Sequence, residues 1–334
     1  MPYRVALIGA GGMGRIHLRC WSAIPDVDVV AIIAEPIESA QSLIKQTGIV
    51  GARAYQSFDA ALHDCNPDIV DICSPTATHA DYVVQAAAAG KALFVEKPLG
   101  RTLVDCDRAV AAVEQAGVPA MAGHVVRYFP AYAQAKRSVD AGAVGIPATV
   151  RVSRVCRHPG KWYGDHALSG GALLDLSIHD FDWLLWTFGQ VDHVYARSVS
   201  QPPAGVLPLD YALVTLRFKS GVIGHLTGSW AHSAGFRTTF EIAGDTGLID
   251  HDSARTSTLS VQLQKPTTPN VPATLQKESP LAPADDPYFQ ELKSFVDSLK
   301  NGENPPVTLQ EAHNAVRVAL AAIESAKSGK VIHI

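Results

Sequence analysis

Three titratable side chains recur along one face of a helix predicted over Ala172–Phe188. At 3.6 residues per turn, Asp175, His179 and Asp182 lie within roughly 60° of one another, among Leu, Ile, Phe and Trp. Titratable groups in such apolar surroundings need partners or a cleft. Asp175, one turn before His179, could orient the imidazole and raise its basicity, so His179 could act as a general base. The alternative is a buried His–Asp pair with only a structural role, and the spacing supplies no third ligand for a metal.

A lysine in the run Glu96-Lys97-Pro98 follows a predicted strand. Open α/β sheets bind ligands at the carboxyl ends of their strands, so a cation here could stabilise negative charge that develops on a substrate oxygen. The Lys97–Pro98 bond has only a small trans preference, and a cis form would aim the lysine. A surface lysine without a catalytic role is the competing interpretation.

A glycine-rich turn stands directly after one predicted strand and begins a helix: Gly9, Ala10, Gly11, Gly12, Met13 and Gly14. The first glycine of this G-x-G-x-x-G pattern allows a tight turn, the second lets backbone approach a pyrophosphate, and the third lets helix pack on strand. The helix N-terminus attracts phosphates. The pattern therefore predicts dinucleotide binding, with a tight turn that binds no ligand as the alternative.

An acidic residue, Glu35, ends the next predicted strand about 20 residues past the last glycine, where a carboxylate accepts hydrogen bonds from the adenine ribose. Its charge would repel a 2′-phosphate, and the residues that follow offer no cation. The sequence predicts NAD as the cofactor. NADP is the alternative if a more distant arginine such as Arg53 folds back.

The elements that hold these residues alternate between strand and helix in the first third of the chain. Apolar runs typical of parallel strands covered on both faces are predicted at Val5–Ile8, Val27–Ile33, Ile69–Cys73, Ala92–Val95 and Val118–Met121. Helical stretches connect them. This alternation predicts an α/β Rossmann dinucleotide-binding domain over residues 1–123.

The pattern changes after Gly123 to segments that alternate in polarity, such as Ala148–Val155, Val191–Val199 and Val222–Trp230. They predict an α+β domain over residues 124–334, with a mostly antiparallel open sheet packed on one face. A stretch rich in Pro, Thr, Ser and Ala, residues 266–287, is predicted to form a surface loop.

Composition limits the partners. A net charge of −4 gives no reason to expect nucleic acid or an anionic membrane. No stretch approaches the ~20 apolar residues of a membrane span, and the N-terminus has no signal-peptide pattern. Five scattered cysteines without a C-x-x-C pair indicate reduced thiols and argue against structural zinc. The expectation is a cytoplasmic protein with a small-molecule substrate and no metal.

A nicotinamide dehydrogenase that acts on an alcohol needs a bound cofactor, a base for the hydroxyl proton, and a cation for the developing alkoxide. The glycine-rich turn, His179 and Lys97 supply one each. Together they predict an oxidoreductase.

The chain resembles the glucose–fructose oxidoreductase/inositol dehydrogenase (Gfo/Idh/MocA) family over nearly its whole length. The matching motifs are Gly9–Gly14 with His17, Ser74-Pro75-Thr76 with His79, Glu96-Lys97-Pro98, Gly123 with Arg127, Gly170-Gly171, Asp175-x-x-x-His179 and Glu324–Gly329. Glu-Lys-Pro combined with Asp-x-x-x-His is specific to this family.

The resemblance implies hydride transfer between NAD(P) and a secondary hydroxyl or ketone of a sugar, inositol or related cyclic polyol. It implies that Lys97, Asp175 and His179 are catalytic and contact the substrate. It also implies homo-oligomers, tetramers or dimers, formed through the outer face of the second domain's sheet. The cofactor-lining residues that it implies are Ser74, Pro75, Thr76, His79, Glu96 and Lys97.

Substrate recognition departs from the family pattern at one position. Many inositol-type members carry Asn where this chain has Val125, which weakens the case for myo-inositol itself. Arg127, by its match to the family, and Trp162 and Tyr163, by their aromatic rings before the catalytic helix, are candidates for contact with a polyol ring. Solvent-exposed loop positions are an equal alternative for Trp162 and Tyr163.

Two other functions are compatible with the same fold. One is a dinucleotide-sensing regulator without activity, against which the retention of Lys97, Asp175 and His179 counts. The other is an enzyme that cleaves glycosides through a transient keto-sugar, which would keep the same three residues.

Overall fold

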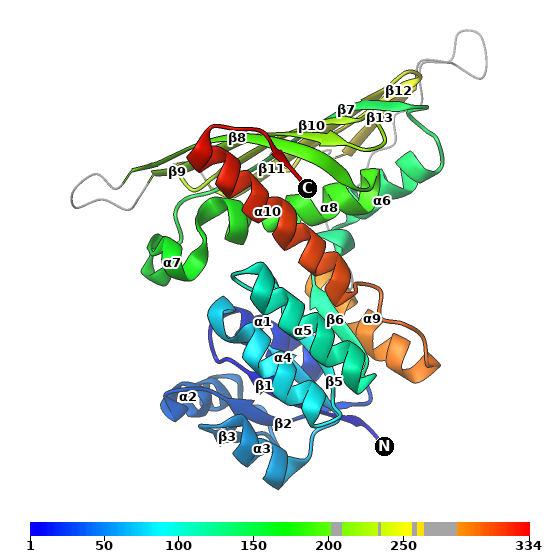
Figure 1. Cartoon of the computed structure of the whole chain (residues 1–334). Helices are drawn as coiled ribbons and strands as arrows, with labels where there is room; N and C mark the ends of the chain where they lie inside the picture. The colour runs from blue at the N-terminus through cyan, green and yellow to red at the C-terminus, as the bar shows by residue number, and fades with distance from the viewer. Residues whose placement is uncertain (202–208, 233–234, 256–258, 264–285) are drawn as a thin grey trace. The chain divides into compact units, whose positions relative to one another are not determined.

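The computed structural model describes residues 1–201, 209–232, 235–255, 259–263 and 286–334, which form two compact units (Figure 1). The first unit combines Met1–Val125 with Asp285–His313, and the second combines Val126–Ala284 with Asn314–Ile334. The sequence assigned everything after Gly123 to the second domain. The structure differs because a late helix, α9 (Pro287–Asn301), packs on α1 (Gly12–Ala23) of the first unit. The loop predicted over residues 266–287 lies outside the described residues as far as position 285.

Six parallel strands form the sheet of the first unit, in the order β3-β2-β1-β4-β5-β6. Their bounds are β1 (Tyr3–Ile8), β2 (Val27–Ile33), β3 (Arg53–Tyr55), β4 (Ile69–Ile72), β5 (Ala92–Glu96) and β6 (Ala120–Gly123). The predicted Rossmann fold is confirmed, and only the three-residue β3 is too short to show a pattern in the sequence. The order reverses between β1 and β4, where such a sheet opens a ligand crevice at its carboxyl edge.

Helices of the first unit begin and end at the residues that their sequence favours. Besides α1 and α9 they are α2 (Ile37–Thr47), α3 (Phe58–Cys65), α4 (His79–Ala88) and α5 (Leu103–Ala116). The hydroxyls of Ser57 and Thr102 accept hydrogen bonds from the first turns of α3 and α5. Gly117 ends α5 in the left-handed region, with φ of 64°.

The second unit is built on an eight-stranded sheet in the order β13-β12-β11-β7-β10-β9-β8-β14. The pair β7–β10 is parallel and the other pairs are antiparallel, so the predicted mostly antiparallel sheet is confirmed. The bounds are β7 (Pro147–Val155), β8 (Val191–Gln201), β9 (Leu209–Phe218), β10 (Ile223–Ser229), β11 (Arg237–Gly244), β12 (Gly247–Asp252), β13 (Leu259–Leu263) and β14 (Ile332–His333).

One face of this sheet is covered by helices α6 (Pro130–Asp140) and α8 (Ile178–Phe188) (Figure 1). The rings of Tyr132 and Trp183 each lie 5.0 Å from Phe240 of β11. Along Tyr211–Phe218 of β9, buried and exposed residues alternate strictly. Short α7 (His166–Ser169) precedes α8, and α10 (Leu309–Ser328) begins in the first unit and continues in the second. Among the described residues, no helix is long and apolar enough to cross a membrane.

Candidate active site

The glycine-rich turn follows β1 at the point where the sheet order reverses. Gly9 has φ of 111°, and a Cβ there would lie 2.4 Å from the carbonyl oxygen of Cys73, which follows β4. A Cβ on Gly14 would lie 1.9 Å from the carbonyl oxygen of Gly9. Both glycines are required because backbone passes within contact distance of backbone.

Gly11 and Gly12 differ, because a Cβ on either would meet nothing within 4 Å. Among the described residues, no side chain caps the N-terminus of α1. Open space therefore lies beside a helix end whose N–H groups and partial positive charge favour phosphate. These residues fit the pyrophosphate of a dinucleotide.

The glycines should therefore respond differently to alanine. Gly11→Ala should fold normally and weaken NAD binding by about tenfold or more, equivalent to about 1.4 kcal/mol, because the added methyl group occupies the pyrophosphate space. Gly14→Ala should instead destabilise the fold by about 1–3 kcal/mol, through overpacking against the Gly9 carbonyl. Thermal melts and calorimetric NAD titrations separate the two. Equal loss of stability in both variants would contradict this assignment.

Glu35 lies exposed, directly after β2 and before α2. We expect the protein to bind NAD more tightly than NADP, since this carboxylate would face a 2′-phosphate. Glu35→Ala should reduce the preference. Calorimetric titration of both cofactors tests this expectation, and NADP affinity equal to or above that for NAD in the parent protein would overturn it.

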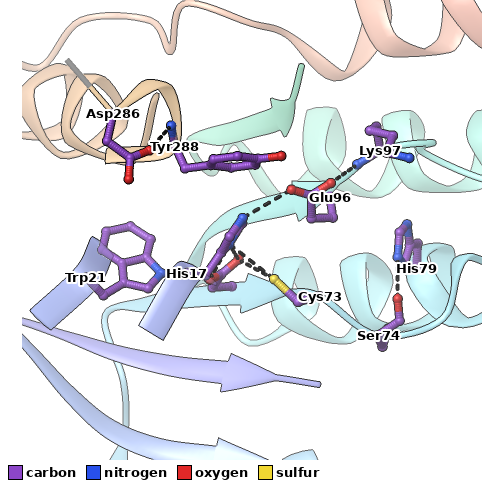
Figure 2. A network of polar contacts seen from close by, with 10 residues as sticks. His17, Trp21, Cys73, Ser74, His79, Glu96, Lys97, Asp286 and Tyr288 are labelled. Carbon is purple, nitrogen blue, oxygen red and sulfur yellow. Dashed lines mark hydrogen bonds and ion pairs between the residues drawn. The ribbon is translucent and has the colours of Figure 1, made fainter. Parts of the chain in front are cut away.

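Of the other predicted cofactor residues, those after β4 form a polar turn. The Ser74 and Thr78 hydroxyls lie 2.7 Å apart, Thr76 is buried and Pro75 is exposed. His79 is 1% exposed, and its Nε2 lies 2.8 Å from the carbonyl oxygen of Ser74 (Figure 2). Its Nδ1 lies 2.8 Å from the carbonyl oxygen of Pro98. Burial lowers the pKa of His79, so the neutral ring donates to one of them. His79 thus joins the turn after β4 to the loop after β5.

Glu96, the residue before Lys97, is buried. Its Oε2 accepts a hydrogen bond of 2.9 Å from the Lys97 backbone N–H, and its Oε1 lies 3.1 Å from His17 Nε2. Burial by itself would raise the pKa of Glu96, but the hydrogen bond and charge of His17 hold it below its ordinary value. Lys97 is half-buried and joined to Pro98 by a cis peptide bond. The Glu96 carboxylate therefore holds the backbone of Lys97 at the carboxyl end of β5.

In the second unit, the predicted continuous helix over Ala172–Phe188 is wrong in one respect. It begins with a π-helical turn, η4 (Ala172–Leu176), in which the Ser177 N–H donates to the Ala172 carbonyl, and α8 continues from Ile178. The Ala172 N–H donates to Oδ2 of Asp210 at 2.7 Å, which holds the start of this turn. Single π turns inside helices are frequent at functional sites.

Asp175 and His179 are half-buried, whereas every other residue of Gly171–Leu184 is buried. In a segment otherwise committed to the core, these two side chains alone retain access to solvent. That exposure is what a base and its partner need to reach a substrate.

Asp182, which the helical spacing placed beside them, belongs to a different group. It is 1% exposed, and its carboxylate accepts hydrogen bonds of 2.8 and 2.6 Å from Arg127. Asp180 and Arg154 form a second buried pair of this kind, at 2.9 and 2.8 Å. The predicted substrate residue Arg127 is therefore held by Asp182 within the second unit, at 7% exposure. Buried acids on a helix are stable when paired in this way.

The two predicted aromatic residues precede α7. Tyr163 lies edge-on to Trp230, with ring centroids 6.0 Å apart, and His158 contacts the same indole at 5.1 Å. The Trp162 side chain lies outside the part of the chain that the structure describes. Tyr163 thus forms part of an aromatic group in the second unit.

The sequence motifs did not identify one buried residue of the first unit, the partner of His17. Asp71 lies within β4 and is fully buried, and it contacts His17 at 2.9 Å and accepts a hydrogen bond of 2.7 Å from Trp21 Nε1. The sequence did contain a sign of it, because Asp71 is an acidic residue in an otherwise apolar strand. A buried carboxylate of this kind needs a polar partner.

The chain is similar to known proteins over nearly its whole length. Residues 3–124 match the oxidoreductase family with an NAD-binding Rossmann fold, and residues 132–250 match the GFO/IDH/MocA C-terminal domain. Myo-inositol 2-dehydrogenase of Thermotoga maritima is 30% identical, over 99% of this chain and 98% of its own. The NAD-dependent scyllo-inositol 2-dehydrogenase of Bacillus subtilis is 29% identical, over 99% and 96%.

Among solved structures, GenD2 from gentamicin A biosynthesis in complex with NAD superposes with a TM-score of 0.86 at 28% identity, over 100% of this chain and 96% of that one. Levoglucosan dehydrogenase in complex with NADH and levoglucosan has a TM-score of 0.90 at 22% identity, which bears on the fold alone. The dinucleotide-binding turn, the Rossmann topology and these matches over the full length agree. The chain is an NAD-binding oxidoreductase and belongs to the Gfo/Idh/MocA family.

Proposed function

We propose that the protein oxidises a secondary hydroxyl of a sugar, inositol or related cyclic polyol with NAD, or reduces the corresponding ketone. The accessible pair Asp175 and His179 in a buried helix carries this proposal. The inositol dehydrogenases to which the chain is 29–30% identical support the substrate class.

Each residue has a separate task in the reaction. His179 takes the hydroxyl proton, and Asp175 orients the imidazole. Lys97 holds positive charge against the alkoxide oxygen as it develops. Gly11, Gly12 and the α1 N-terminus bind the pyrophosphate, and Glu35 binds the adenine ribose. When held there, NAD would supply the hydride acceptor for the substrate carbon, and the products would be a ketone, NADH and a proton.

The test is a screen of inositols, aldoses and sugar derivatives with NAD, read as NADH absorbance. We expect turnover of at least one cyclic polyol or sugar, abolished in a Lys97→Met, His179→Ala double variant. NAD binding without turnover of any compound in either direction would contradict the proposal and indicate a dinucleotide sensor.

We also propose a homo-oligomer in the cytoplasm. The uncovered face of the eight-stranded sheet exposes Tyr211, Leu213 and Ile223 at 38%, 50% and 37%, an apolar surface that a second copy could bury. All five cysteines are free thiols, as a reducing compartment favours. Light scattering should give the mass of a dimer or tetramer, and a monomer would refute the assembly.

A further inference from the structure

A network of polar contacts joins α1, β4 and β5 in the first unit (Figure 2). His17 of α1 is fully buried, between the carboxylates of Asp71 and Glu96. Its Nδ1 lies 2.9 Å from Asp71 Oδ2, and its Nε2 lies 3.1 Å from Glu96 Oε1. One imidazole therefore bridges the end of β4 to the end of β5.

The two carboxylates, one beside each ring nitrogen, favour a charged imidazole. A neutral ring has one N–H, so its other nitrogen would direct a lone pair at a carboxylate, whereas an imidazolium donates to both. The other groups that face it bring no second cation: the Cys73 thiol is 3.1 Å from Nδ1, and the Tyr288 ring of α9 is 6.4 Å away. Although burial opposes the charge, Asp71 and Cys73 raise the pKa of His17 well above its ordinary value.

The chain of contacts ends at Lys97. Glu96 uses one oxygen for His17 and the other for the Lys97 backbone N–H. A hydrogen bond to an ionised acceptor is roughly twice as strong as one between neutral groups. The charge of Lys97 also lowers the pKa of Glu96, but less than His17 does. Without the imidazolium, the buried carboxylate takes up a proton more readily and loses that strength.

We propose that His17 is a positioning residue for hydride transfer: as a buried imidazolium it keeps Glu96 ionised, and Glu96 in turn holds the backbone of Lys97 in its working position. Asp71 is the counter-charge that keeps His17 protonated. This role rests on the proposed function, because it takes Lys97 to act on the substrate.

The first test measures the imidazole itself and needs no activity. Nitrogen-15 spectra of the full-length protein, with the His17 ring signal assigned through its covalent connection to the His17 backbone, should show an imidazolium at pH 8. Glu96→Gln and Asp71→Asn should each lower the pKa of His17. An imidazole that is neutral at pH 8 and does not respond to either substitution would overturn the proposal. A His17 signal that changes on dialysis against EDTA would overturn it too, by revealing a bound metal.

The second test is a double-mutant cycle on kcat with the substrate from the screen. His17→Gln and Glu96→Gln should each lower kcat, by up to about 10²-fold for a misplacement near 1 Å, with KM for NAD nearly unchanged. The double variant should be no worse than Glu96→Gln, because His17 acts through Glu96. If the kcat losses of the two single variants multiply in the double variant, His17 does not act through Glu96 and the proposal is refuted. His17→Gln should raise the pH at which protonation of Glu96 lowers kcat/KM. Glu96→Gln should remove that step and leave only the acid limb of the general base His179.

A matched control exists in the same unit. His313 contacts Asp107 at 2.9 Å, a His–carboxylate pair between α10 and α5, so His313→Gln should leave kcat and the pH profile unchanged. If His17→Gln fails to fold, the spectra of Glu96→Gln and Asp71→Asn still decide the outcome. Parent-like turnover by Lys97→Met would refute the proposed role of Lys97, and the spectra would still report on His17 and Glu96.

Discussion

Replacement of His179 with alanine is expected to lower kcat by about 10²–10⁴, the usual contribution of a general base. His179 is half-buried near the start of α8, in a segment where Asp175 alone shares that exposure, so its imidazole is available to a substrate. Affinity for NAD should stay nearly constant, since the glycine-rich turn that binds it is in the other unit. Steady-state kinetics and calorimetric titration of NAD measure the two quantities.

The same helix supplies the control. Asp182→Asn removes the charge that faces Arg127 in the buried interior, and breaking such a pair typically costs about 3–5 kcal/mol. This variant should lose thermal stability while its folded fraction turns over at a normal rate. If His179→Ala shows that behaviour instead, His179 is a core residue and the general base lies elsewhere.

Lys97→Met is expected to lose activity by about 10²-fold or more, the scale of removing one preorganised electrostatic donor. Methionine has a similar length and no charge, so the fold should persist. Lys97→Arg should recover little, because a broad planar guanidinium does not replace a compact ammonium in a fitted pocket. NADH production by the parent and both variants gives the result.

Lys91 provides a matched lysine just before the same strand. Its ammonium donates to the Asn66 side chain at the surface, so Lys91→Met should retain parent activity. Full turnover by Lys97→Met would remove Lys97 from the mechanism. A parent protein without turnover, in which Lys97→Met merely shifts NAD affinity, would indicate a sensor.

Much of the architecture could be read from local pattern. The strands of a parallel sheet are apolar throughout, so β1, β2, β4, β5 and β6 were visible in the sequence. The alternation in polarity likewise revealed β7, β8 and β10 of the second sheet. What could not be read was where α9 packs. Its amphipathic pattern shows that one face is buried but does not identify the partner, which is α1.

The site shows the same division between local pattern and tertiary contact. Asp175 and His179 were chosen by spacing, and the structure leaves both accessible. The spacing could not exclude Asp182, because Arg127, which neutralises it, lies far away in the sequence. The spacing also could not reveal the π-helical turn over Ala172–Leu176, because the additional residue in such a turn does not change the amino-acid composition in a recognisable way.

The attachment of α9 to the first unit bears on how the chain is made. On the ribosome, residues 1–125 emerge first, yet the helix that covers α1 and brings Phe295 against Phe94 leaves roughly ten seconds or more later, at about 5–20 residues per second. Until then, the apolar surface of α1 stays uncovered while strands β7 to β13 of the second unit are synthesised. A nascent chain therefore makes seven of the eight strands of the second unit before the first unit is complete. Truncation before residue 286 should yield an aggregation-prone fragment.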